Sequence, residues 1–224
     1  MTPTRPGNDE GARPTRPTLS RAYIVSKALA LIDRDGLEKF SMRRLGADLE
    51  VDPMAVYHYF PTKADLFDAI VEAVWTGIEI PASASEGPWI EAMVAYFTAA
   101  RVALCRHPAA LPAVATRPVK TQPILEFIEV VAARLVRAGA RPDQTFDVIN
   151  VLAYFVSGHA LAEVGEPVGG PDNPQFNIAE LDLAAIPTLV QAFSSGYEFD
   201  ADRQFDLGLR GMLVGLGERL GLHD

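Results

Sequence analysis

The sequence has few of the features that mark exported, membrane-spanning or metal-binding proteins. It contains one cysteine, Cys105, so neither an internal disulfide bond nor a cysteine-based zinc site can form within one chain. No uninterrupted apolar run approaches the roughly 18 residues that a membrane-spanning helix needs. The first twenty residues carry three arginines and four prolines instead of the apolar core of a signal peptide. These absences predict a cytoplasmic protein.

Positive charge is also scarce, and its distribution is uneven. The chain holds 20 Lys and Arg against 29 Asp and Glu, a formal net charge of −9, which at first argues against phosphate binding. Residues 1–63, however, hold 10 Lys and Arg against 8 Asp and Glu, while residues 64–224 hold 10 against 21. This polarity allows the N-terminal part to approach DNA while the acidic remainder faces away.

Apolar residues make up 49% of the chain and recur at helical spacing from Ser20 onward. No run of alternating β-branched residues bounded by turns is present, so we predict an all-α protein of about ten helices. Residues 1–17 and 166–177 are rich in proline and glycine and are interpreted as a disordered arm and a loop. The arm's arginines either contact DNA or are simply solvated. After the first four helices, near 20–35, 41–49, 53–59 and 62–80, others are expected near 89–107, 111–116, 122–138, 142–162, 180–194 and 202–222.

The strongest local signal is the stretch "SMRRLGADLEVDPMAVYHYFPTK", residues 41–63. Two short helices joined by a tight turn form a helix-turn-helix, whose second helix fits a DNA major groove. Helices that cross steeply need a small residue where they touch, and Ala47 within "Leu45-Gly46-Ala47" is the expected one. This pattern predicts an N-terminal, three-helix DNA-binding domain.

The string "AVYHYFPTKADLFDAI" after this motif resembles the signature of the TetR family of transcriptional regulators. The resemblance spans about residues 20–78. It implies a repressor with an N-terminal DNA-binding domain, here residues 18–63, and an effector-binding and dimerisation domain, here residues 64–224. Double-stranded operator DNA, a small-molecule effector and a second copy of the chain are the implied partners.

DNA contacts can be assigned along the second helix of the motif and at its flanks. Met54, Ala55 and His58 are expected at base edges, with Ala55 against a thymine methyl. In the resembling proteins the position of Tyr57 reaches a phosphate or base, but its residue type equally suits the core. Four further residues are expected to contact phosphates: Arg43, Arg44, Tyr59 through its hydroxyl, and Lys63.

The segments "TRPVKTQ" (116–122) and "LAYFVSGHALAE" (152–163) resemble the effector domain of the tetracycline repressors. Those proteins hold a magnesium chelate of the drug through a histidine and a glutamate. This sequence has Ala113 and Ala162 at the matching positions, so neither metal-linked group is present. The resemblance therefore implies neither a metal nor a cofactor, and tetracycline is not expected as the effector.

The remaining residues of this domain favour an apolar or aromatic ligand. Arg117, Asn150 and His159 could orient it through their polar groups. Tyr96, Phe97, Ala100, Val114, Phe127, Ile149, Ala153 and Tyr154 could form the wall, although each could equally be ordinary core. His107 is interpreted as a helix cap, and Cys105 as a buried small hydrophobe, with a redox sensor as the alternative.

The helices near 142–163 and 202–222 are candidates for a dimer interface, because the interior glycines of the last one suit close approach of another backbone. Two other functions compete with a ligand-released repressor of a palindromic operator. An enzyme is disfavoured by the absence of a nucleophile elbow, a paired-histidine metal motif or a phosphate loop. A DNA-binding regulator without a small-molecule effector remains open.

Overall fold

The computed structural model describes residues 18–85, 87–117, 120–165 and 182–223. Within these ranges the chain forms ten α-helices and no strand, which confirms the predicted all-α class. The arm expected at 1–17 and the loop expected at 166–177 lie outside the described residues. The helices are α1 (Arg21–Asp35), α2 (Met42–Asp48), α3 (Pro53–Tyr59), α4 (Lys63–Thr76), α5 (Trp89–Cys105), α6 (Leu111–Thr116), α7 (Gln122–Arg137), α8 (Pro142–Val164), α9 (Pro187–Ser194) and α10 (Ala201–Leu220).

Local capping residues set where the first helices begin. The hydroxyls of Ser20, Ser41 and Thr62 each accept a hydrogen bond from the backbone N–H three residues later, at 3.1–3.2 Å. The Asp65 carboxylate in turn accepts a hydrogen bond from the N–H of Thr62 at 2.9 Å, which completes a capping box on α4. Such bonds satisfy amides that have no partner inside the helix, so α1, α2 and α4 start where the sequence predicts.

The helix expected at 180–194 starts later than predicted. Within the described residues, a short 3₁₀ turn spans Leu183–Ala185, and α9 begins at Pro187. Proline fits the first turn of a helix, where its missing N–H has no intrahelical partner to lose. The apolar periodicity extends across this turn, so it could not show the break.

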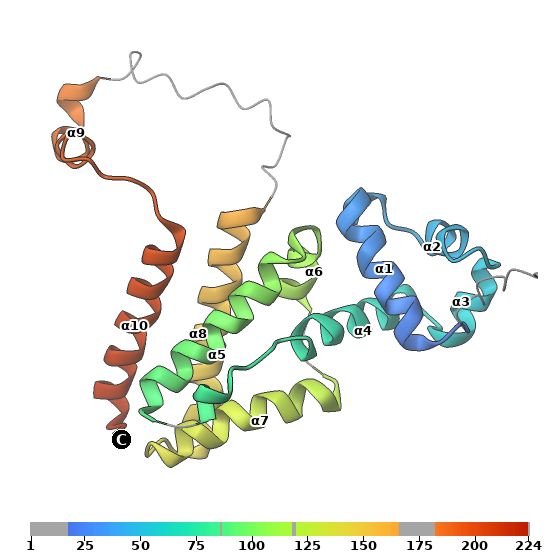
Figure 1. The fold of residues 1–224 in the computed structure, drawn as a ribbon, viewed down its shortest axis with the longest axis horizontal. Helices are drawn as coiled ribbons and strands as arrows, with labels where there is room; N and C mark the ends of the chain where they lie inside the picture. The colour runs from blue at the N-terminus through green and yellow to red at the C-terminus, as the bar shows by residue number, and fades with distance from the viewer. Residues whose placement is uncertain (1–17, 86, 118–119, 166–181, 224) are drawn as a thin grey trace, which may run out of the picture.

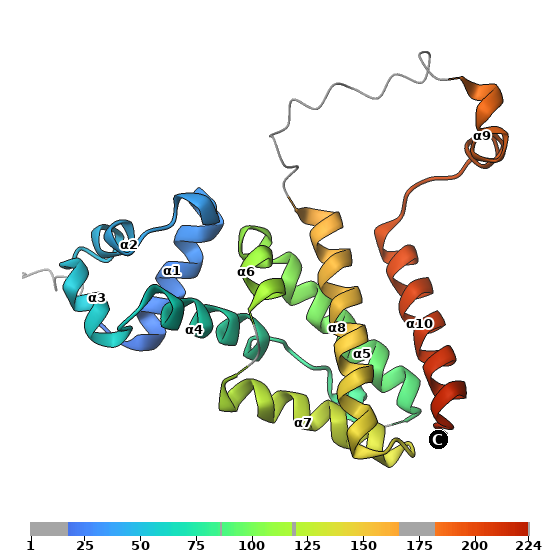
Figure 2. The ribbon, with the colours of Figure 1, turned by 180° about the vertical axis from the view of Figure 1, so that it is seen from behind.

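Two hydrophobic cores divide the molecule, and α4 contributes to both. Helices α1, α2 and α3 gather at one end, and α4 leads from them into the bundle of α5, α6, α7, α8 and α10 (Figures 1 and 2). Leu66, Phe67 and Ile70 of α4 pack in the N-terminal core, and Val71 and Val74 pack in the C-terminal core. The packing boundary therefore lies within α4, beyond the domain boundary expected at residue 63.

A buried arginine, a partly buried glutamate and an exposed aspartate join α5, α8 and α10. The Arg101 side chain donates two hydrogen bonds to Glu163, both at 2.8 Å, and one to Asp202 at 2.7 Å. Arg101 is 7% exposed, and its guanidinium lies 4.9 Å from the centroid of the Phe205 ring. The adjacent guanidinium holds the pKa of Glu163 below its ordinary value. These bonds compensate the burial of the arginine and fix the start of α10 beside the end of α8.

By length and composition alone, α8 could cross a membrane, but the core helix of a soluble protein meets the same test. Here it packs against α5, α6, α7 and α10. We therefore describe it as a core helix.

The small residue at the α2–α3 crossing is Gly46, not the expected Ala47. Gly46 is buried, and a Cβ atom there would lie 3.1 Å from the carbonyl oxygen of Val51 and 3.2 Å from Pro53. Ala47 is exposed to solvent. The two positions are 100° apart around a helix, and only the one that faces α3 must be small.

We expect Gly46→Val to lower the free energy of unfolding by about 1–3 kcal/mol, because the added methyl groups would displace Val51 and Pro53. Ala47→Val is the matched control, since the same side chain one residue later points into solvent and costs only about 0.5 kcal/mol in helix propensity. Chemical denaturation of both variants measures the difference. Equal destabilisation would place the crossing contact elsewhere.

Candidate DNA interface and ligand cavity

The short helix α3 presents the side chains expected to contact bases. Asp52 caps it by accepting from the N–H of Met54 at 2.8 Å, and Val56 anchors it in the core at 0% exposure. Met54 is 70% exposed, and His58 is also exposed. Ala55 is half-buried. Tyr57, left open between surface and core, is 37% exposed and so available at the surface.

The structure corrects the role expected for the Tyr59 hydroxyl. It donates a hydrogen bond to the carbonyl oxygen of Leu19 at 2.9 Å, so its single hydrogen already has a partner. The partner precedes Tyr59 by 40 residues, so no local pattern could reveal it. Tyr59 therefore ties the start of α1 to the end of α3.

The cations near α3 differ in how far they are already paired. Arg44 contacts Asp35 at 2.7 Å and donates to the carbonyl of Lys39. Its guanidinium, expected to contact a phosphate, is therefore already engaged within the chain. Lys63 donates to the carbonyl of Phe40 at 3.2 Å, so one of its three N–H groups is engaged. Arg43 is exposed and has no hydrogen bond or ion pair with any residue that the structure describes. Arg43 is thus the least engaged of these three cations among the described residues.

An apolar cavity of about 80 Å³ lies between α4, α5, α7 and α8. Seven of the eleven predicted ligand residues line it, together with Trp75 of α4, which was not predicted. These seven are Tyr96, Phe97, Ala100, Phe127, Ile149, Asn150 and Ala153. Trp75 lies beside the buried stripe of α4. A large apolar side chain just outside the buried stripe of a helix was the feature of the sequence that could have indicated its place in the cavity wall.

The other four predicted ligand residues lie outside the cavity. Val114, Arg117 and Tyr154 line an adjoining open groove of about 670 Å³, which shares Trp75 and Asn150 with the cavity. Tyr154 is 71% exposed. His159 faces α10, with its ring 5.1 Å from that of Phe205, and it lines neither the cavity nor the groove.

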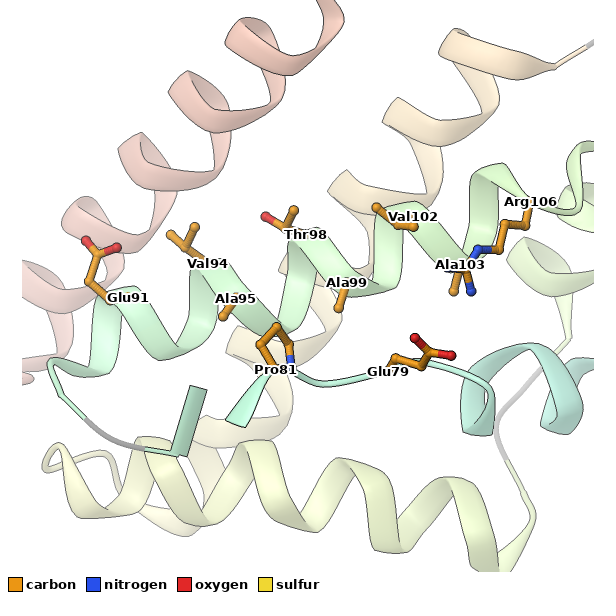
Figure 3. Close-up of a pocket in the computed structure, with 10 residues that line it drawn as sticks. All are labelled: Glu79, Pro81, Glu91, Val94, Ala95, Thr98, Ala99, Val102, Ala103 and Arg106. Atoms are coloured by element: carbon orange, nitrogen blue, oxygen red, sulfur yellow. The ribbon is translucent and has the colours of Figure 1, made fainter. Parts of the chain in front are cut away.

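Another groove, of about 620 Å³, runs along α5 beside the segment that follows α4 (Figure 3). Its lining combines two acidic residues, Glu79 and Glu91, with Arg106 and short apolar side chains. None of the predicted ligand residues lines it, and Glu91 is already paired with Arg210 at 2.6 Å.

One ion pair and one histidine–carboxylate contact connect the effector region to the N-terminal helices. Arg117, after α6, contacts Asp68 of α4 at 2.7 Å and donates to the carbonyl of Ala64 at 3.0 Å. The Nδ1 atom of His107 lies 2.8 Å from Asp33 of α1. His107, expected as a helix cap, instead joins the two regions.

Comparison with known proteins identifies this arrangement. Residues 24–70 match the family model described as bacterial regulatory proteins, tetR family, and residues 81–220 match that described as tetracyclin repressor-like, C-terminal domain. The chain belongs to the TetR family. The two matches together include the helix-turn-helix and most of both hydrophobic cores.

Relatives in the TetR family cover most of the chain. An HTH-type transcriptional repressor DrrR1 from Streptomyces coeruleorubidus is 29% identical over 84% of this chain and 70% of its own length. An HTH-type transcriptional regulator from Saccharopolyspora erythraea is 29% identical over 93% of this chain and 89% of its own. The crystal structure of a possible TetR family regulator from Streptomyces coelicolor is 28% identical, with a TM-score of 0.73 over 88% of this chain and 98% of that one.

The single cysteine shows no sign of a redox role. Cys105 is partly buried at the end of α5, with its Sγ 3.8 Å from Glu163. Burial raises the pKa of its thiol most, and the nearby Glu163 carboxylate raises it further. A raised pKa reduces the thiolate fraction and hence the reactivity, which supports the structural interpretation of this residue.

Proposed function

We propose that this protein is a cytoplasmic, homodimeric repressor that binds a palindromic operator and leaves it when an apolar or aromatic molecule enters the cavity. One observation carries the proposal: Trp75 lines the cavity, and the helix that bears it also packs in the core of the DNA-binding domain. A ligand of ordinary size needs several hundred Å³, so its entry must displace part of this wall. The runner-up is a regulator without an effector, which the cavity disfavours.

The exposed side of α3 supports DNA binding. Met54, Tyr57 and His58 project from one short helix, and Ala55 lies among them. We assign Met54, Ala55 and His58 to base edges, Tyr57 to a base or phosphate, and Arg43 and Lys63 to phosphates. Asp48 pairs with Arg34 at 3.0 Å, so this acid near the surface is partly neutralised.

We expect Arg43→Ala to weaken binding to the operator and to random DNA by the same factor, because phosphate contacts do not read sequence. The operator would first be selected from random DNA. The slope of log affinity against log salt should fall by about 1. Arg137→Ala, at the distant end of α7, is the control and should change neither quantity. A loss confined to the operator would refute the phosphate assignment.

Exposed apolar faces on α8 and α10 support a dimer. On α10, Leu207 is 74% and Val214 is 48% exposed, and a Cβ at Gly211 or Gly215 would meet nothing within 4 Å. The expectation that all interior glycines of this helix face a second chain needs correction. Gly208 and Gly217 instead accommodate rings of the same chain, where a Cβ would lie 2.7 Å from Phe155 and Trp89 respectively.

The double variant Leu207→Glu, Val214→Glu is expected to sediment as a monomer at concentrations where the unmodified protein is a dimer, since it buries two carboxylates in the interface. Val136→Glu, which replaces a valine of similar exposure at the end of α7, should remain dimeric. Circular dichroism checks that all the proteins stay helical. A monomeric unmodified protein, or a double variant that still dimerises, would contradict this interface.

The cavity can act on the DNA-binding domain through α4. A push through α6 and the residues before it is less direct, because none of residues 109–116 lines the enclosed cavity and only Val114 to Thr116 line the groove. Trp75 offers a direct route, because movement of its helix carries Leu66 and Phe67 with it. Arg117 adds a second connection through Asp68. A rotation of α4 would change the spacing of the two recognition helices and hence operator affinity.

Coupling of this kind is reciprocal. The operator must therefore lower the affinity for the effector by the same factor with which the effector lowers the affinity for the operator. For an aromatic compound found by thermal shift, calorimetry with and without operator should give affinities about 5–150-fold apart. Trp75→Ala should bring this ratio towards 1, whereas Leu125→Ala, in the groove alone, should not.

Identical affinities with and without operator would remove the inducer role while leaving DNA binding intact. Tetracycline with magnesium is the negative arm of the experiment. It should not release the operator, because Ala113 and Ala162 replace the metal-linked groups and neither lines the cavity.

A further inference from the structure

The cavity wall includes a tyrosine whose hydroxyl has no hydrogen-bond partner among the described residues. Tyr96 of α5 is 4% exposed and lines the cavity, yet its hydroxyl forms no hydrogen bond with any residue that the structure describes. A phenylalanine would fill nearly the same space but would offer no hydroxyl. The phenol is therefore suited to donate to a molecule that enters from outside.

The cavity wall also excludes a charge. No Asp, Glu, Lys, Arg or His lines it, and besides Tyr96 its polar side groups are those of Asn150, which opens onto the groove, and the indole of Trp75. The nearby guanidinium of Arg117 lies in the groove and is already paired with Asp68. An ionised group inside would lose its hydration without gaining a countercharge.

The remaining wall suits a flat ring system. Trp75, Tyr96, Phe97 and Phe127 bring aromatic rings from three helices around one small space. Aromatic rings pack favourably on one another in offset-stacked or edge-to-face contacts. The wall is otherwise aliphatic apart from Asn150 at the mouth.

We propose that the cavity binds an uncharged aromatic ketone whose carbonyl oxygen accepts a hydrogen bond from the Tyr96 hydroxyl. This rests on the proposed function, in which the cavity is the effector site. The hydrocarbon rings lie among the aromatic side chains, and polar substituents extend past Asn150 into the groove. Tyr96 is thus the residue that selects ketones over hydrocarbons of the same shape.

The test uses three bicyclic probes of nearly equal shape: 1-tetralone, tetralin and 1,2,3,4-tetrahydro-1-naphthoate. Titration calorimetry on the full-length protein without DNA should show 1-tetralone binding about three- to tenfold more tightly than tetralin, the effect of one hydrogen bond. The carboxylate should bind at least about tenfold more weakly than the ketone. In Tyr96→Phe, the preference for the ketone over the hydrocarbon should fall to about one.

Tyr154→Phe is the matched control, because it removes the same hydroxyl from an exposed tyrosine of the groove and should keep the preference. Tyr96→Phe removes one oxygen and leaves no void, so its thermal unfolding checks only that the fold is retained. Equal affinities for ketone and hydrocarbon, a preference that survives in Tyr96→Phe, tightest binding by the carboxylate, or binding by none of the probes would each overturn the inference.

A gel shift with operator DNA separates this inference from the proposed function. A ketone preference that depends on Tyr96, without release of the operator, would confirm the ligand class and refute the effector role. Release of the operator by 1-tetralone that is unchanged in Tyr96→Phe would support the effector role and refute the ligand class.

Discussion

The continuity of α4 through two hydrophobic cores constrains the rest of the structure. Leu66 and Ile70 are fully buried in one core, and Val74 is 4% exposed in the other. A helix is stiff over this length, because every residue added is held by its own backbone bond. The DNA-binding end and the cavity end therefore move as one body. The capping box at Thr62 fixes where that body begins.

The helices that local chemistry specifies were predictable, whereas the partners of exposed polar groups were not. Ser20, Ser41 and Pro53 mark helix starts within a few residues of themselves, and the structure places α1, α2 and α3 accordingly. The Tyr59 hydroxyl and Arg44, in contrast, find partners that only the tertiary fold brings near. A sequence pattern records which side chain can donate, but not which acceptor lies within 3 Å of it.

The same limit explains which ligand residues the sequence located. Leu152, Val156 and Ala160 form the fully buried stripe of α8. Tyr154 lies about 200° around the helix from Leu152, which turns it towards solvent, and His159 lies on the flank that meets α10. Aromatic residue type indicated a binding role for Tyr154, but the direction of the side chain decided against the cavity.

The hydrogen bonds of Arg101 with Glu163 and Asp202 have a consequence for the length of chain between these two carboxylates. Glu163 and Asp202 are far apart in the sequence, so one guanidinium holds the end of α8 against the start of α10. Lengthening a closed loop costs little, about 0.6 kcal/mol for each doubling. The contact between α8 and α10 should therefore persist when residues are added between Glu163 and Asp202.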